Sequence, residues 1–126
     1  MHQSRLCALL IDCNVPDVDE AARFWAQALG RAVDLGHPGS RNNYRMLEMQ
    51  SDEPIVQIQR VDHDSRIHLD IETDDLAAEV ARLERLGATV SDRLPRWVVM
   101  RAPTGQRFCV VRVQRPGFPK NAMRWE

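Results

Sequence analysis

The chain has 126 residues, 44% of them hydrophobic and 28% charged, which suits one globular domain with a single continuous core. Lysine plus arginine number 17 against 18 for aspartate plus glutamate, so the net charge is -1. This balance argues against a nucleic-acid partner and against binding to an anionic membrane surface. No apolar run is long enough to span a bilayer, so we expect no membrane partner.

The amino-terminal residues and the cysteines indicate a cytoplasmic protein. The start, MHQSRLCALLIDC, lacks the long apolar segment and the small-residue cleavage site of a signal peptide. The three cysteines, Cys7, Cys13 and Cys109, each lie in an apolar stretch. An odd number of cysteines in such surroundings favours free, buried thiols in a reducing compartment over a disulfide framework.

The first half of the chain predicts the order strand, helix, strand, strand, strand. The apolar run Leu6–Cys13 indicates a mostly buried strand that ends in a turn. Residues 17–30, DVDEAARFWAQALG, predict an amphipathic helix capped by Asp17, with Phe24 and Trp25 in the core. Three further strands are expected within residues 31–36, 44–50 and 54–61.

The second half predicts the same order. Residues 66–73, RIHLDIET, alternate between apolar and polar side chains, which is typical of a strand with two different faces. A second amphipathic helix is expected over residues 74–87, with four leucine and valine residues facing inward: Leu76, Val80, Leu83 and Leu86. The remaining segments are expected to be an extended piece, two strands joined by a tight turn, and an irregular tail: residues 88–92, 96–102, 107–114 and 115–126.

The two halves form a repeat. Each closes its helix with Leu-Gly and begins a strand two residues later, and the glycines Gly30 and Gly87 lie 57 residues apart (87 minus 30). That period is too long for a solenoid unit and suits a βαβββ module that pairs with a second copy to bury its sheet. We therefore expect a single domain over residues 1–126, made of modules at about 5–62 and 66–114 with a tail at 115–126.

With these elements the chain resembles the vicinal oxygen chelate superfamily, the glyoxalase/bleomycin-resistance fold, and within it the compact glyoxalase-like domain proteins. The resemblance covers about Leu6 to Val113 and is most specific in DVDEAARFWAQALGR, IHLDIETDD and WVVMRAPTGQRFCVV. The last stretch departs from the family's Asp-Pro-x-Gly-Asn turn, because Ala102 and Gln106 replace the Asp and the Asn. The resemblance implies an α+β fold in which two βαβββ modules form a curved mixed sheet around a concave pocket, with the helices outside. It also implies a homodimer.

In the metal-dependent branches of this superfamily, histidines of first strands and glutamates of last strands hold a divalent ion. Here His68 matches the histidine of the second module, and the first module has no histidine at the corresponding position. The two glutamate positions fall on Cys109 and on Gln57 or Gln59. Amides are weak metal ligands, and the nearby Asp12 lies one residue from the register expected to line the pocket. The departures from the family pattern therefore predict no metal and no cofactor.

Polar residues of several predicted strands are expected to line the concave pocket instead. His68 titrates near neutrality and is a candidate proton-transfer group, with a ligand-binding or a purely structural histidine as alternatives. Cys109 is expected to be an inert thiol, although Arg107 on the same face could activate it. The predicted ligand-binding residues are His68, Asp70, Glu72, Gln57, Gln59, Cys109 and Trp97, with Tyr44 a further candidate for an aromatic wall.

These observations predict a metal-independent, small-molecule-binding protein of the glyoxalase/bleomycin-resistance type, with the ligand in the concave face of the sheet. One alternative is a lyase or isomerase that uses His68 for proton transfer. The other is a degenerate member that serves as an interaction module. The expected partners are a small organic ligand and a second copy of the chain.

Overall fold

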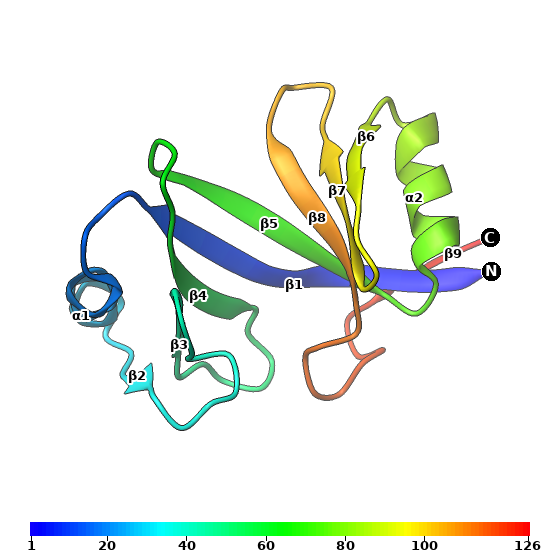
Figure 1. Cartoon of the computed structure of the whole chain (residues 1–126). Helices are drawn as coiled ribbons and strands as arrows, with labels where there is room; N and C mark the ends of the chain where they lie inside the picture. Colours follow the sequence, from blue (N-terminus) through cyan, green and yellow to red (C-terminus); the bar gives the residue numbers. More distant parts are fainter. The chain divides into compact units, whose positions relative to one another are not determined.

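The structure, a computed structural model, describes residues 1–126 as two helices and nine strands (Figure 1). The chain divides into two compact units. The first unit comprises Ala8–Ile67, and the second unit comprises Met1–Cys7 together with His68–Glu126. Neither helix is long and apolar enough to cross a membrane. The predicted α+β class is confirmed.

The first unit has the predicted βαβββ order. Its sheet runs in the order β2, β3, β4, β1; β1 and β4 are parallel, and the other neighbours are antiparallel. The long strand β1 contributes its residues from Ala8 onward to this unit. The elements are β1 (His2–Cys13), α1 (Val18–Leu29), β2 (Val33–Asp34), β3 (Tyr44–Leu47) and β4 (Ile55–Arg60).

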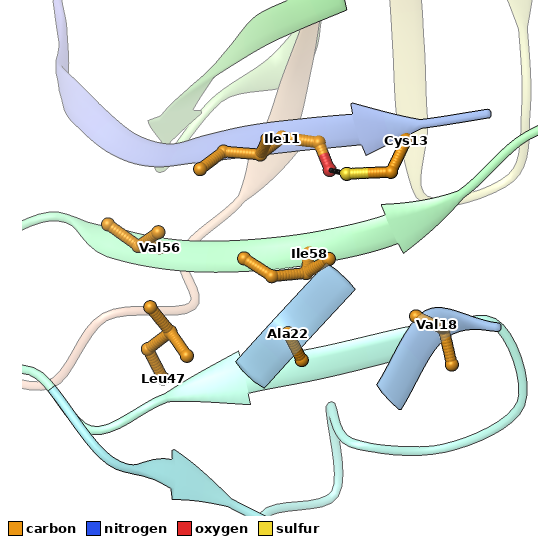
Figure 2. Close-up of a cluster of buried hydrophobic side chains, with 7 residues drawn as sticks. All are labelled: Ile11, Cys13, Val18, Ala22, Leu47, Val56 and Ile58. Atoms are coloured by element: carbon orange, nitrogen blue, oxygen red, sulfur yellow. Dashed lines mark hydrogen bonds between the residues drawn. The ribbon is translucent and has the colours of Figure 1, made fainter. Parts of the chain in front are cut away.

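Helix α1 packs one side against this sheet. Asp17 caps it by accepting a hydrogen bond from the Asp19 N–H at 2.9 Å, and Gly30, at φ +68°, ends it in the left-handed conformation. Figure 2 shows the core that results, which consists of Ile11, Cys13, Val18, Ala22, Leu47, Val56 and Ile58. Trp25 packs against this cluster as expected, although it is only partly buried.

The prediction that Phe24 lies in the core is wrong, because 61% of its surface is exposed. Phe24 follows the buried Ala22 by two residues, which places it about 200° around the helix and away from the sheet. Its ring contacts that of Trp25 edge-on, with 5.1 Å between the centroids.

The second unit repeats the βαβββ order and adds one strand. Its sheet runs in the order β5, β8, β7, β6, in which β5 and β8 are parallel and the other neighbours antiparallel. Helix α2 buries Val80 and Leu83 against it, but Leu86 is 65% exposed because it forms the cap after the last helical turn. The expectation of an inward Leu86 was therefore wrong. The elements are β5 (Arg66–Thr73), α2 (Leu76–Arg85), β6 (Thr89–Arg93), β7 (Trp97–Arg101), β8 (Arg107–Arg112) and β9 (Met123–Trp125).

The sequence predicted an irregular C-terminal tail, but part of this tail is a strand. Met123–Trp125 forms β9, which pairs antiparallel with His2–Ser4, so β1 begins before its predicted start and the two chain ends lie side by side (Figure 1). The Trp125 indole N–H donates to Ser4 Oγ at 2.8 Å, and the Arg82 guanidinium stacks on the Trp125 ring at 3.8 Å. Hydrophobic patterning could not predict this pairing, because polar side chains dominate its contacts.

Two carboxylates are fully buried in the second unit, and both are surrounded by donors. Glu72 accepts from the backbone N–H groups of Gln114 (2.6 Å) and Arg115 (2.9 Å) and from Arg5 Nε (2.6 Å). Glu79 contacts His2 Nε2 and Arg82 Nε, each at 2.8 Å. Burial by itself raises the pKa of each carboxyl, but the hydrogen bonds outweigh it and lower both pKa values below the ordinary one.

These lowered pKa values predict a specific loss of stability in acid. A carboxylate whose pKa is lower in the folded than in the unfolded chain stabilises the fold above its ordinary value of 4.5, and this contribution is lost as the pH falls through the lowered pKa. Glu72→Gln should lower the free energy of unfolding at pH 7 by about 3 kcal/mol, since Arg5 stays buried without its charge partner. Chemical denaturation at a series of pH values from about 3 to 7, a range that covers the titration of carboxyl groups, measures both effects.

The matched control is Glu84→Gln, which removes an exposed carboxylate from α2. It should leave both the stability at pH 7 and its acid dependence close to those of the unsubstituted chain. Equal acid dependence in Glu72→Gln and Glu84→Gln would contradict the assignment.

Candidate ligand-binding site

The sheet of the second unit has a polar face on the side opposite α2. Along β5, Ile71 packs against the core beneath α2, so Asp70 on the same strand points to the other side. The register pairs Asp70 with Cys109 of β8, and Cys109 with Val99 of β7. Paired residues point to the same face, so these three side chains form one row across the sheet, and His68 precedes that row by two residues.

The structure brings the imidazole of His68, the carboxylate of Asp70 and the thiol of Cys109 together. Their potential ligand atoms all lie within 4.8 Å of one another. His68 Nε2 lies 3.8 Å from Asp70 Oδ1, close enough for electrostatic attraction but too far for a hydrogen bond. The side chains of His68 and Asp70 are 16% and 13% exposed, and Cys109 is half-buried. We call these three residues the donor cluster.

Glu72 shares this strand face but is used differently. Its side chain is fully buried, and both carboxylate oxygens accept hydrogen bonds from Arg5 or from the backbone after β8. These contacts give Glu72 a structural role as the anchor of β5. Its predicted contact with a ligand is not part of the site we propose.

Trp97 lies one row away from the donor cluster. It pairs with Val111 of β8, which in turn pairs with Glu72 of β5. Val98 and Met100 point into the core under α2, so Trp97 faces the same side as Cys109. Its ring is partly exposed and offers an apolar surface beside the polar groups.

The predicted glutamines lie in the first unit, on the side of β4 away from α1. Gln57 Nε2 donates to the Gly39 carbonyl at 3.0 Å, and Gln59 Nε2 donates to Tyr44 Oη at 2.9 Å. Asp12 pairs with Gln59 and therefore shares its face; the expectation that Asp12 falls outside this register was wrong. The continuous apolar run of β1 gave no alternation from which to set its register. That the glutamines join the donor cluster in one pocket remains a prediction.

The other two cysteines differ from Cys109 in their surroundings. Burial, reinforced by the nearby charge of Glu72, raises the pKa of the Cys7 thiol far above its ordinary value. Burial also raises the pKa of Cys13, whose Sγ lies 3.5 Å from the Ile11 carbonyl oxygen. None of the three cysteines forms a disulfide, and Cys109 is the one that is not buried.

A cavity of about 450 Å³ lies in the first unit, between α1 and the start of β5. Its walls are mostly apolar and include Phe24, Trp25 and Ile67, with Asp12 and Arg66 as its charged members. None of the predicted ligand-binding residues lines it.

A family model described as glyoxalase-like domain matches residues 8–111, most of the chain. The chain belongs to the glyoxalase-like domain family. The predicted membership of the vicinal oxygen chelate superfamily is confirmed by this match together with the structural neighbours. No curated protein sequence resembles this glyoxalase-like chain closely enough to count as a match.

Three solved structures illustrate the likeness in fold. Methylmalonyl-CoA epimerase from Mycobacterium tuberculosis superposes with a TM-score of 0.60 at 19% identity, covering 86% of this chain and 87% of the epimerase. The Mn(II)-bound glyoxalase from Novosphingobium aromaticivorans gives 0.57 at 21%, covering 87% of this chain and 38% of that one. An extradiol ring-cleaving dioxygenase from B. fuscum gives 0.59 at 13%, covering 92% and 35%. At these identities the likeness establishes the fold and not the activity.

The differences among the thiols predict selective labelling of the native glyoxalase-like chain. A maleimide reagent should modify Cys109 at least about tenfold faster than Cys7 or Cys13, because buried thiols react only from transiently opened states. Intact mass and peptide mapping measure the site and rate of labelling. Cys109→Ser should lose the fast phase, and similar rates at all three thiols would contradict the assigned burial.

Proposed function

We propose that this glyoxalase-like protein binds a small organic ligand on the polar face of its second unit, at the donor cluster of His68, Asp70 and Cys109. The observation that carries the proposal is the convergence of three different polar groups within 4.8 Å on one sheet face. Small-molecule sites typically combine a few convergent polar groups with apolar surroundings. Trp97, one row away on the same face, supplies such a surface.

The chemistry of the cluster favours a ligand with oxygen functions at one end and an apolar part at the other. An imidazole both donates and accepts hydrogen bonds, whereas a carboxylate only accepts them. Hydroxyl or carbonyl groups of a ligand would meet His68 and Asp70, and its apolar part would lie against the Trp97 ring. Aromatic hydroxy acids, hemithioacetals and acyl thioesters fit this description.

The second candidate function is a lyase or isomerase reaction with His68 as the proton-transfer group. The Asp70 carboxylate at 3.8 Å supports this role, because it favours one orientation of the imidazole and attracts its protonated form. The alternative of a degenerate interaction module has no specific structural observation behind it.

Metal independence was predicted from the absence of carboxylates at the two glutamate positions. That reasoning left out Asp70, which lies beside His68 and Cys109. Metal independence stays a prediction, and Asp70 is the carboxylate that the prediction did not consider.

The homodimer and the cytoplasmic location remain predictions. On β5, Ile67 and Leu69 lie on the apolar face of the strand and are 58% and 43% exposed. Exposed aliphatic side chains of this kind are compatible with a surface that a second copy covers.

Ligand binding is tested by a thermal-shift screen with aromatic acids, hemithioacetals, acyl-CoA esters and glycopeptide antibiotics. A true ligand at about 100 times its Kd should stabilise the chain by about 2.7 kcal/mol. His68→Ala and Trp97→Ala should each reduce this shift, whereas His63→Ala, at an exposed histidine of the first unit, should leave it unchanged. A shift that is the same in all three variants would place the ligand elsewhere.

Catalysis is tested with a ligand that also turns over. His68→Gln keeps hydrogen-bonding capacity but cannot transfer a proton near neutral pH, so kcat should fall by roughly 10²- to 10⁴-fold while the Kd changes little. Single-turnover kinetics and isothermal titration calorimetry measure the two quantities. Unchanged turnover in His68→Gln would exclude the proton-transfer role and leave binding intact.

A further inference from the structure

We infer that Arg101 and Arg107 form an oxyanion-binding subsite beside the donor cluster, so that the organic ligand of this face carries a carboxylate or phosphate group. We call these two residues the arginine pair. The inference rests on the proposed function, because the anionic group would belong to the ligand that meets the donor cluster. It adds the charge of that ligand and the direction in which the ligand lies along the strands.

Strand pairing places the two arginines side by side. Arg101 of β7 and Arg107 of β8 are direct partners in the antiparallel pairing of these neighbouring strands (Figure 1). Val98, Met100 and Val110 point into the core beneath α2, so both arginines point to the polar face. Directly opposed residues have Cβ atoms about 5 Å apart, so the two guanidinium groups can contact the same bound group.

Neither positive charge of the arginine pair is neutralised within the chain. Both side chains are exposed, and neither forms an ion pair with a carboxylate. Arg101 Nη1 donates to the Gly105 carbonyl at 3.2 Å, in the turn between the two strands, which leaves most of its N–H donors for other partners. Like charges directly opposite each other destabilise a pair of strands, and a bound anion would remove this repulsion.

The charge of the second unit also favours an anionic ligand. This unit has eleven lysine and arginine residues against eight aspartate and glutamate residues, a net charge of +3, whereas the first unit has six against ten, a net charge of -4. On the polar face, Asp70 and Asp92 lie one row away from the arginine pair, level with Cys109 and Val99. A local excess of positive charge raises the local concentration of anions.

The rows of the sheet define the shape of the ligand. The arginine pair lies two residues along the strands from the row of Cys109 and Val99, and Trp97 lies two residues on the other side of that row. Two residues of a strand span about 6.6 Å, so we expect an anionic group roughly 7 Å from the oxygen functions that meet the donor cluster. A guanidinium binds carboxylate and phosphate oxygens through paired hydrogen bonds, so either group suits the arginine pair.

The first test follows the Nε–Hε signals of the arginines by NMR in the full chain, titrated with inorganic phosphate or with acetate at constant ionic strength. The signals of Arg101 and Arg107 should shift with one saturable dependence on anion concentration. Arg101→Gln and Arg107→Gln should each weaken anion binding by at least about tenfold, because each removes charge-assisted hydrogen bonds. Tighter binding of phosphate would assign a phosphate ester as the ligand, and tighter binding of acetate would assign a carboxylate.

The matched control is Arg112→Gln, which removes an exposed arginine of β8 that points to the opposite face. It should change anion binding by less than about twofold, because salt screens exposed charges that do not contact the anion. An equal effect of Arg112→Gln and Arg107→Gln would mean that only the total charge matters, and would overturn the inference.

Thermal unfolding gives a second readout and shows that each variant is folded. Without oxyanions, Arg107→Gln should be at least as stable as the unsubstituted chain, because the substitution removes the repulsion between the two arginines. Added phosphate or acetate should raise the Tm of the unsubstituted chain and leave that of Arg107→Gln unchanged. A Tm that neither anion raises would overturn the inference.

The link to the organic ligand is tested with para-hydroxybenzoate and its methyl ester, which differ in the charge at one end. The acid should bind at least about tenfold more tightly than the ester, and Arg107→Gln should remove this difference. An organic ligand whose binding depends on His68 but is unchanged in both arginine variants would overturn the inference and leave the proposed function intact. Binding of inorganic anions at the arginine pair, with no organic ligand found, would support the subsite and count against the proposed function alone.

Discussion

A fully buried carboxylate is the constraint on which the second unit depends. Glu72 lies on β5, and its three donors come from β1 and from the chain after β8, so one side chain ties three segments together. A buried charge without such donors costs far more than any single apolar contact contributes. The fold is therefore stable only when all the donors are in place, and this requirement positions β5 and β8. Those two strands set the positions of His68, Asp70 and Cys109.

Strand β5 buries polar side chains, which is not what an alternating strand usually indicates. The sequence of β5 has an apolar and a polar face, and the usual expectation is that the apolar face is the covered one. In the structure Asp70 and Glu72 of the polar face are buried, whereas Ile67 and Leu69 of the apolar face are exposed and Ile71 of that face packs against the core beneath α2. Ion pairs and backbone donors compensate the buried polar groups. The strand thus buries polar groups on one face, and its aliphatic face is exposed at its first half only.

The fold itself leaves the chemistry open. An epimerase, a manganese-bound glyoxalase and a ring-cleaving dioxygenase share it at identities of 19%, 21% and 13%. What distinguishes such proteins is the set of side chains that the strands carry. In this chain that set is an imidazole, a carboxylate and a thiol in one module, with amides on the strand β4 of the other. The thiol in particular makes the site chemically softer than one built from histidine and glutamate alone.

Local sequence determined the elements of this protein, because helix caps, hydrophobic periodicity and turn residues act over a few neighbouring positions. Asp17, Gly30 and the repeated Leu-Gly helix ends were enough to predict both helices and the duplicated βαβββ order, and the residue motifs were enough for the family. Tertiary structure alone decided which strand faces are covered and where β9 pairs. It also decided that Phe24 and Leu86 lie outside the core and that Asp70 lies beside Cys109. Those features depend on strand register and on ion pairs between residues as far apart as Arg5 and Glu72, and no local pattern encodes either.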